Sequence, residues 1–309
     1  MIRIRSVLLA AGGVAVLAAP GAAQPDRQRL DTTFAFTNGM VDVRSVSGPI
    51  SITTWNRREV RISAFVERGE IVAELSSSRV RLEAKGVRGR LGDHEFTLVV
   101  PAGTRVEANA VSGDVTVRGT RSDIDVETVS GDVRVEDVEG RLNLSSVSGD
   151  IAGERVGGTV RFTSVSGEVR LRDASGSIGG ESVSGSVEVE GRATSLRLTS
   201  VSGDLTYRGG LDPTGRYAMQ AHSGTLTLVL PDDARADLTV KTFTGQLDTR
   251  MILDGDRRDG MRLRLGGDGR RRRDAMRLTL GGGGATVDLE TFSGTITLRK
   301  SGAKASRED

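Results

Sequence analysis

The stretch "SVSGDI" (Ser146–Ile151) contains a phrase, valine-serine-glycine followed by an acid, that recurs along the chain. The glycine of this phrase recurs with an 18-residue period, at Gly113, Gly131, Gly149, Gly167, Gly185 and Gly203. A fixed period in this range indicates a solenoid, in which each repeat forms one coil stacked on the next. The sequence therefore predicts an all-β fold, a single parallel β-solenoid with 18-residue coils.

Alignment on these glycines places apolar residues in columns that alternate with polar ones, which is the periodicity of strands with one buried face. Each coil is expected to contain two short strands, with Ser-Gly at one corner and a variable turn such as "EDVEGR" (136–141) at the other. One column expected to be buried consists of the valines before the Ser-Gly corner: Val111, Val129, Val147, Val165, Val183 and Val201.

The repeat extends beyond its most regular part. "VDVRSVSGPISI" (41–52) fits the same frame, with Gly48 at the corner. Towards the C-terminus the period loosens to a 21-residue spacing, at Gly224 in "AHSGTLTL" and Gly245 in "TFTGQLDT". The last corner, Gly294 in "TFSGTITL", follows after a longer interval, so we expect one further 21-residue coil plus an excess around 254–284.

Two segments depart from the frame. The first, 56–110, contains alternating stretches such as "EVRISAFVE" and "HEFTLVVPAG", and predicts a coil or two carrying hairpins, with at most a helical turn near 71–78. The second, 254–284, predicts an Arg-rich inserted hairpin or loop. Its run Arg270, Arg271, Arg272 and Arg273 is either a solvated loop tip or a contact with an anionic ligand.

The N-terminal segment predicts an exported protein. Arg3 and Arg5, the apolar stretch 7–19 and small residues before Gln24 have the layout of a signal peptide at 1–23. We expect the solenoid domain to span 24–300 and the tail 301–309 to be disordered. The chain has no cysteine, and its net charge of +2 and 3% aromatic content argue against a nucleic-acid partner.

The acid after each corner glycine has two interpretations. In the first, serine and a short acid complete a tight turn around a glycine whose backbone conformation other residues avoid. In the second, the acids of successive coils form a row that binds cations. We favour the turn and predict no metal and no cofactor, because the loop lacks the glycine-rich pattern of calcium-binding β-rolls. The row would consist of Asp114, Asp132, Asp150, Glu168 and Asp204.

Catalytic patterns are scarce, so we predict that the protein is not an enzyme. His94 in "GDHEF" lacks the second histidine of a zinc-protease helix. His222 shares a column with Phe243 and Phe292, and is expected to be a packed side chain beside a corner serine rather than a base. Neither a threonine array nor an aromatic stripe for sugar stacking is expected.

Three phrases carry a resemblance to a known family: "VVPAGTRVEANAVSGDVTVRG" (99–119), "LVLPDDARADLTVKTFTGQL" (228–247) and "ATVDLETFSGTITLRK" (285–300). They resemble bacterial β-strand-repeat domains of unknown function that are called putative adhesins. The resemblance covers about 40–300 and implies an exported solenoid of the bacterial envelope, with no catalytic residues to transfer.

Three functions follow as hypotheses. The first is a non-enzymatic adhesion or binding module in the periplasm or at the cell surface, whose partner is an envelope protein, a glycan or an anionic membrane surface. The second is an accessory protein for envelope-stress signalling that uses the solenoid as a protein-interaction platform. The third, a polysaccharide-active β-helix enzyme, is disfavoured because the chain has few aromatic residues and lacks a cleft motif. The corner glycines (Gly48, Gly113, Gly131, Gly149, Gly167, Gly185, Gly203, Gly224, Gly245 and Gly294) are assigned a structural role.

Overall fold

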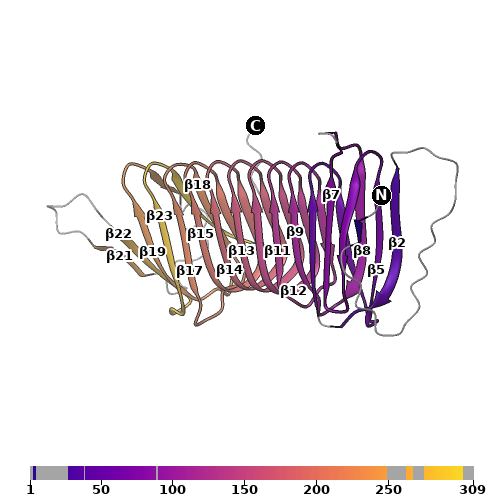
Figure 1. The fold of residues 1–309 in the computed structure, drawn as a ribbon. Coiled ribbons are helices and arrows are strands. Elements are labelled where there is room, and N and C mark those ends of the chain that lie inside the picture. The colour runs from indigo at the N-terminus through magenta and orange to yellow at the C-terminus, as the bar shows by residue number, and fades with distance from the viewer. Residues whose placement is uncertain are drawn as a thin grey trace. The chain divides into compact units, whose positions relative to one another are not determined.

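The protein is all-β, as predicted. The computed structural model describes residues 3–4, 27–37, 39–87, 90–248, 262–266 and 275–301, and the chain divides into two compact units, Met1–Ala152 and Gly153–Asp309. The described residues form strands joined by turns and contain no helix (Figure 1). The predicted signal peptide and tail lie outside them, apart from residues 3–4 and 301.

The first unit is built from short strands that enclose an aliphatic interior. Its strands are β1 (Arg3–Ile4), β2 (Gln28–Ala35), β3 (Met40–Ser45), β4 (Ile50–Trp55), β5 (Glu59–Val66), β6 (Glu70–Leu75), β7 (Arg79–Lys85), β8 (His94–Pro101), β9 (Arg105–Ala110), β10 (Val115–Arg118), β11 (Ile124–Thr128) and β12 (Val133–Ser146). The next strand, β13 (Ile151–Ser164), begins at the end of this unit and lies mostly in the second.

The regular coils of the first unit pair in parallel. Val115 of β10 lies opposite Val133 of β12, and Ile124 of β11 lies opposite Leu142, so each residue faces its counterpart in the next 18-residue repeat. Side chains alternate between the interior and solvent along each strand, because successive residues of a strand point to opposite faces. Corresponding aliphatic residues therefore stack on one another inside the coil.

The corner opposite the glycines is not a separate turn, so this part of the prediction is wrong. Strand β12 runs without interruption through "EDVEGR", and the chain bends within it at Asp137, which has φ 55°. Arg155 (φ 52°) and Asp173 (φ 49°) occupy the same place in β13 and β14 (Val169–Ser182). One residue in the left-handed region redirects the strand locally, like a β-bulge. The pairing of β14 shows the corresponding register shift after Leu171.

The segment 56–110 forms a mixed sheet, so purely parallel pairing is wrong there. The expected hairpin is present as the antiparallel pair β6–β7, and β5 pairs antiparallel with both β2 and β8. The helical turn expected near 71–78 is absent, because residues 70–75 form strand β6 with buried Ile71 and Ala73. Within this unit the coil 40–55 lies between two later segments, since β3 pairs with β7 and β9 while β4 pairs with β8 and β10.

The second unit continues with strands of the same kind. After β13 and β14 come β15 (Val187–Ser200), β16 (Leu205–Gly209), β17 (Arg216–Ala221), β18 (Thr225–Leu230), β19 (Ala236–Thr242), β20 (Gln246–Asp248), β21 (Arg262–Gly266), β22 (Ala275–Leu280), β23 (Ala285–Thr291) and β24 (Thr295–Lys300).

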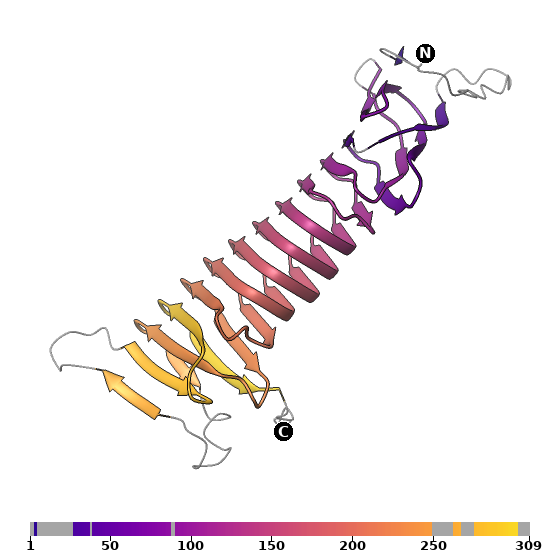
Figure 2. The ribbon, with the colours of Figure 1, turned by 90° about the horizontal axis from the view of Figure 1, so that it is seen from below.

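The last coil is placed out of sequence order. Strand β23 pairs in parallel with β17 on one side and β19 on the other, and β24 pairs with β18 and β20. Figure 2 shows the yellow C-terminal strands between the orange strands that precede them in the chain. The sequential stacking implied by the spacing of Gly224, Gly245 and Gly294 is therefore wrong. Strand β22 pairs antiparallel with both β19 and β21.

The longer, 21-residue spacing begins at a local feature, a pair of buried tyrosines. Val187 of β15 lies opposite Leu205 and Leu196 lies opposite Tyr217, so the extra residues of the coil lie between Leu205 and Tyr217. The Tyr207 hydroxyl donates to the Gly210 carbonyl (2.7 Å), and the Tyr217 hydroxyl donates to the Ala193 carbonyl (2.6 Å). The two rings contact each other with centroids 5.8 Å apart and fill the widened coil.

These tyrosines predict a loss of stability at high pH. Burial raises the pKa of Tyr207 to about 12 and also raises the pKa of Tyr217. An unfolded tyrosine loses its proton near pH 10, so between about pH 10 and 12 the unfolded state binds fewer protons and stability falls as the pH rises. We expect Tyr207→Phe to remove about 2 kcal/mol of this pH-dependent loss. Denaturant titrations of both proteins at pH 8 and pH 11.5 measure it, and an identical decrease in both would contradict it.

Candidate functional site

The corner glycines are required by close approach of neighbouring coils. A Cβ atom at Gly149 would lie closer than 3.0 Å to the carbonyl oxygen of Gly131, a separation that real Cβ atoms essentially never show. The backbone conformation that other residues avoid, expected at the corners, is absent from most of them. Among the corner glycines only Gly224 has a positive φ, of 118°. The same close contact recurs at Gly48, Gly113, Gly131, Gly185, Gly203, Gly245 and Gly294.

The polar residues of the corner hydrogen bond to the backbone. The Ser130 hydroxyl donates to the Val111 carbonyl of the adjoining coil (3.1 Å), and the buried Ser146 hydroxyl donates to the Gly149 carbonyl (2.7 Å). The acids act similarly, since Asp132 Oδ1 accepts the backbone N–H of Asp150 at 2.9 Å. Each such acid joins one coil to the next, which supports the turn interpretation of Val-Ser-Gly-acid.

The valine column points outwards, contrary to the prediction that it is buried. The side chains of Val111, Val129 and Val147 in the first unit and of Val165, Val183 and Val201 in the second are 40–51% exposed. The chain turns at the glycine, so the residue before the valine points inwards instead. Those inward residues include Thr128, Ser146 and Ser200, which are buried. We call the outward-pointing positions the corner row.

In the second unit the corner row changes from aliphatic to ring side chains. The imidazole of His222 stacks on Phe292 with ring centroids 4.9 Å apart, and Phe243 stacks on the other side of Phe292 at 4.8 Å. The ring planes of both pairs are nearly parallel, with interplanar angles of 11°. Phe292 is 46% exposed and Phe243 57%, so the prediction that no aromatic stripe exists is wrong here. We call these three residues the ring ladder.

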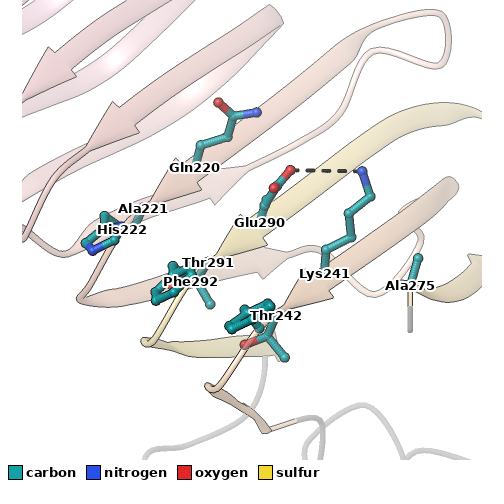
Figure 3. A pocket seen from close by; sticks show the side chains of 10 residues that line it. Gln220, Ala221, His222, Lys241, Thr242, Ala275, Glu290, Thr291 and Phe292 are labelled. Atoms are coloured by element: carbon teal, nitrogen blue, oxygen red, sulfur yellow. Dashed lines mark ion pairs between the residues drawn. The ribbon is translucent and has the colours of Figure 1, made fainter. Parts of the chain in front are cut away.

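The ring ladder borders a pocket of about 780 Å³. A second outward column, two residues earlier on each strand, consists of Gln220, Glu290 and Lys241, and Glu290 and Lys241 form an exposed ion pair at 3.9 Å (Figure 3). The lining is completed by Ala221, Thr242, Ala275 and Thr291. The pocket thus combines an apolar edge with hydrogen-bond donors and acceptors, and its two charges are paired.

A comparison with known families shows which family the chain belongs to. The model of the family described as Toastrack DUF4097 matches residues 36–190, about half of the chain. The chain belongs to the Toastrack DUF4097 family. The match covers the first unit from residue 36 and the start of the second, whereas the ring ladder of this Toastrack chain lies beyond it.

Solved structures similar to this Toastrack chain include two described as adhesion proteins. A putative cell adhesion protein from Clostridium sporogenes is 9% identical, with 89% of this chain and 100% of that chain covered and a TM-score of 0.26. A putative adhesin from Bacteroides fragilis is 12% identical, with 88% and 97% covered and a TM-score of 0.40. A putative lipid binding protein from Parabacteroides distasonis is 12% identical, with 89% and 97% covered and a TM-score of 0.39. None of the curated proteins matches.

In the first unit of the Toastrack chain, His94 occupies a position in the column of corner glycines. Since Phe96 lies opposite Ile50, His94 takes the place beside Gly48 that a glycine holds in other coils. Its Nε2 lies 2.9 Å from the Ser45 hydroxyl and accepts the Gly48 N–H at 3.2 Å, while Nδ1 lies 3.1 Å from the Gly92 carbonyl. Both side chains are buried, and the Ser45 hydroxyl also lies 2.6 Å from the Gly48 carbonyl. This serine–histidine pair is therefore part of the corner packing.

The last predicted site is the run of four arginines. Arg270, Arg271, Arg272 and Arg273 lie outside the described residues, and their contact with an anionic ligand stays a prediction. Within the part of the chain that the structure describes, no group of three or more acidic or histidine side chains could hold a metal ion. The same residues include no helix long and apolar enough to span a membrane.

Proposed function

We propose that this Toastrack protein is an exported, non-enzymatic binding module that attaches to a component of the cell envelope, at the surface or in the periplasm. The signal-peptide pattern at 1–23 supports export. The 18-residue spacing of glycines from Gly113 to Gly203 supports a scaffold of repeated coils. Such arrays present long surfaces on which a binding partner contacts several repeats at once.

The observation that carries the proposal is the corner row. Isolated exposed apolar residues are common on proteins, but contiguous ones indicate an interaction site. In the second unit Val183 and Val201 occupy equivalent positions, and His222 follows in the same column, since the Ser202 and Ser223 N–H groups bond to the Val183 and Val201 carbonyls. Each of these side chains is exposed at a corner that requires its neighbouring glycine. Beside Val183 and Val201, the inward hydroxyls of Ser182 and Ser200 also hydrogen bond to the corner backbone. The corner geometry thus exposes the side chains of the row to a partner.

The proposal predicts that polar substitution of the row weakens envelope binding without unfolding the protein. The variant Val165→Thr, Val183→Thr, Val201→Thr keeps the β-branched shape that strands favour, so its melting temperature should change little. Each substitution removes exposed apolar contact, and together they should weaken binding of labelled protein to isolated cell envelopes by about tenfold, equal to about 1.4 kcal/mol.

A matched control changes exposed residues outside the row. Arg161→Ala and Arg197→Ala alter another outward column of the same unit and should leave envelope binding within about twofold, since isolated surface substitutions have small effects. Fractionation of cells that express the full chain tests export directly. A chain found only in the cytoplasm, or row variants that bind envelopes as well as the wild type, would contradict the proposed function.

A further inference from the structure

The ring ladder differs from the rest of the corner row in shape and in its neighbours. Its rings repeat at 4.9 and 4.8 Å, which is the spacing of adjacent strands in a sheet. Stacked in this way, the rings present a continuous apolar edge to solvent. The outer side of Phe243 has no ring partner among the described residues, consistent with its 57% exposure.

Beside this edge lies the second column, whose side chains provide hydrogen-bonding groups and an ion pair. Gln220 provides an amide that both donates and accepts, while Glu290 and Lys241 neutralise each other at 3.9 Å. On the far side of the corner, the residues that follow Gly224, Gly294 and Gly245 are the uncharged Thr225, Thr295 and Gln246. Among the described residues the site therefore has no excess of either charge, unlike a site for an anionic lipid or a phosphate.

The backbone around the ring ladder is already paired on both sides. Strand β17 lies between β15 and β23, β23 lies between β17 and β19, and β19 lies between β23 and β22. A peptide strand cannot add to these strands, because strand addition needs a free edge with unpaired N–H and carbonyl groups. A ligand must therefore be recognised by the side chains, through an apolar contact and a parallel line of hydrogen bonds.

We propose that the ring ladder, together with Gln220, Glu290 and Lys241, binds a segment of neutral polysaccharide built of 1,4-linked hexose or N-acetylhexosamine units. A pyranose ring has an apolar C–H surface and a rim of hydroxyl groups, which match the ring edges and the polar column. The polymer repeats along its length as the site repeats along the coils. This inference rests on the proposed function and names the envelope component that this part of the surface binds.

Titration calorimetry with chitohexaose and cellohexaose tests the inference on the full chain. We expect at least one of these neutral hexasaccharides to bind, with an affinity that changes less than about twofold between about 50 mM and 500 mM salt, because no net charge is screened. Phe292→Ala and Phe243→Ala should each weaken binding by about tenfold or more. Phe243→Leu, which keeps apolar volume but loses the planar ring, should weaken it less than Phe243→Ala.

The matched control is Phe65→Ala, which removes an exposed phenylalanine from β5 of the other unit and should leave binding unchanged. Circular dichroism and melting curves confirm that each variant is folded before its affinity is compared. A loss of affinity confined to the ladder variants supports a ligand site, because a purely structural role would change melting temperature without changing the affinity of the folded protein.

Two calorimetric results would overturn the inference. One is that neither hexasaccharide binds the wild-type chain. The other is binding that Phe65→Ala weakens as much as Phe292→Ala does. If the chain binds envelopes through the valines of the corner row while neither sugar binds, the polysaccharide site is wrong and the proposed binding function stands. If envelope binding is also absent, both proposals fail. If protease treatment of the envelopes abolishes the part of the binding that Phe292→Ala also removes, the ladder contacts a protein partner and the inference is wrong.

Discussion

Replacing Gly149 by alanine is expected to destabilise the first unit by about 3 kcal/mol or more, far more than a typical surface substitution. The added methyl group would lie closer than 3.0 Å to the carbonyl oxygen and carbon of Gly131. Both are backbone atoms held in the coil, so no side-chain rotation relieves the overlap. The coils must separate locally, which disrupts the hydrogen bonds between them, including that from the Asp150 N–H to Asp132.

A second glycine provides the matched control for Gly149→Ala. Gly179 lies in strand β14 of the second unit, and a Cβ atom added there would meet nothing within 4 Å beyond its own chain neighbours. Alanine reduces the freedom of the unfolded chain, so Gly179→Ala should be neutral or stabilising by up to about 1 kcal/mol. Urea titrations of both variants measure the difference. Similar unfolding midpoints would show that close approach of the coils is not what requires the corner glycine.

The regular part of the fold was predictable because its cause is local and repeated. The 18-residue period of the glycines marks the place where one coil meets the next, and the pairing of Val115 with Val133 follows directly from that period. The direction of the corner valines was not predictable from alternation. Alternation counted back from Val133 would place Val129 inside, whereas alternation counted forward from Val126 places Thr128 inside and Val129 outside, as observed.

Only part of the candidate site could be predicted from the sequence. His222, Phe243 and Phe292 could be placed in one column by their distance from the corner glycine. Their order in space could not, because the 21-residue spacing from Gly224 to Gly245 is also what direct stacking of those coils would give. The pairing of β23 with both β17 and β19 brings Phe292 between His222 and Phe243, and that pairing joins segments far apart in the chain.

The out-of-order coil predicts that a chain ending at Gly284 loses more than its last two strands. In the complete chain β23 separates β17 from β19, and β24 is the partner of β20 within the described residues. Deletion of 285–309 removes the buried side chains of Val287 and Ile296, each of which contributes about 1.5–3 kcal/mol of burial. It also exposes the apolar faces that β23 and β24 covered on both sides. Strands β19 and β20 should therefore unfold locally together with the end of the unit.

Hydrogen exchange distinguishes this arrangement from sequential stacking. We expect the amides of β19 in the truncated chain to exchange at least about 100-fold faster than in the full chain, because local opening then costs much less free energy. A chain ending at Ser301 keeps both strands and should exchange like the full chain. If β19 instead stacked directly on β17, removal of 285–309 would take away only the terminal coil, and β19 would stay protected. Slow exchange of β19 in the shorter chain would therefore contradict the placement of β23 between them.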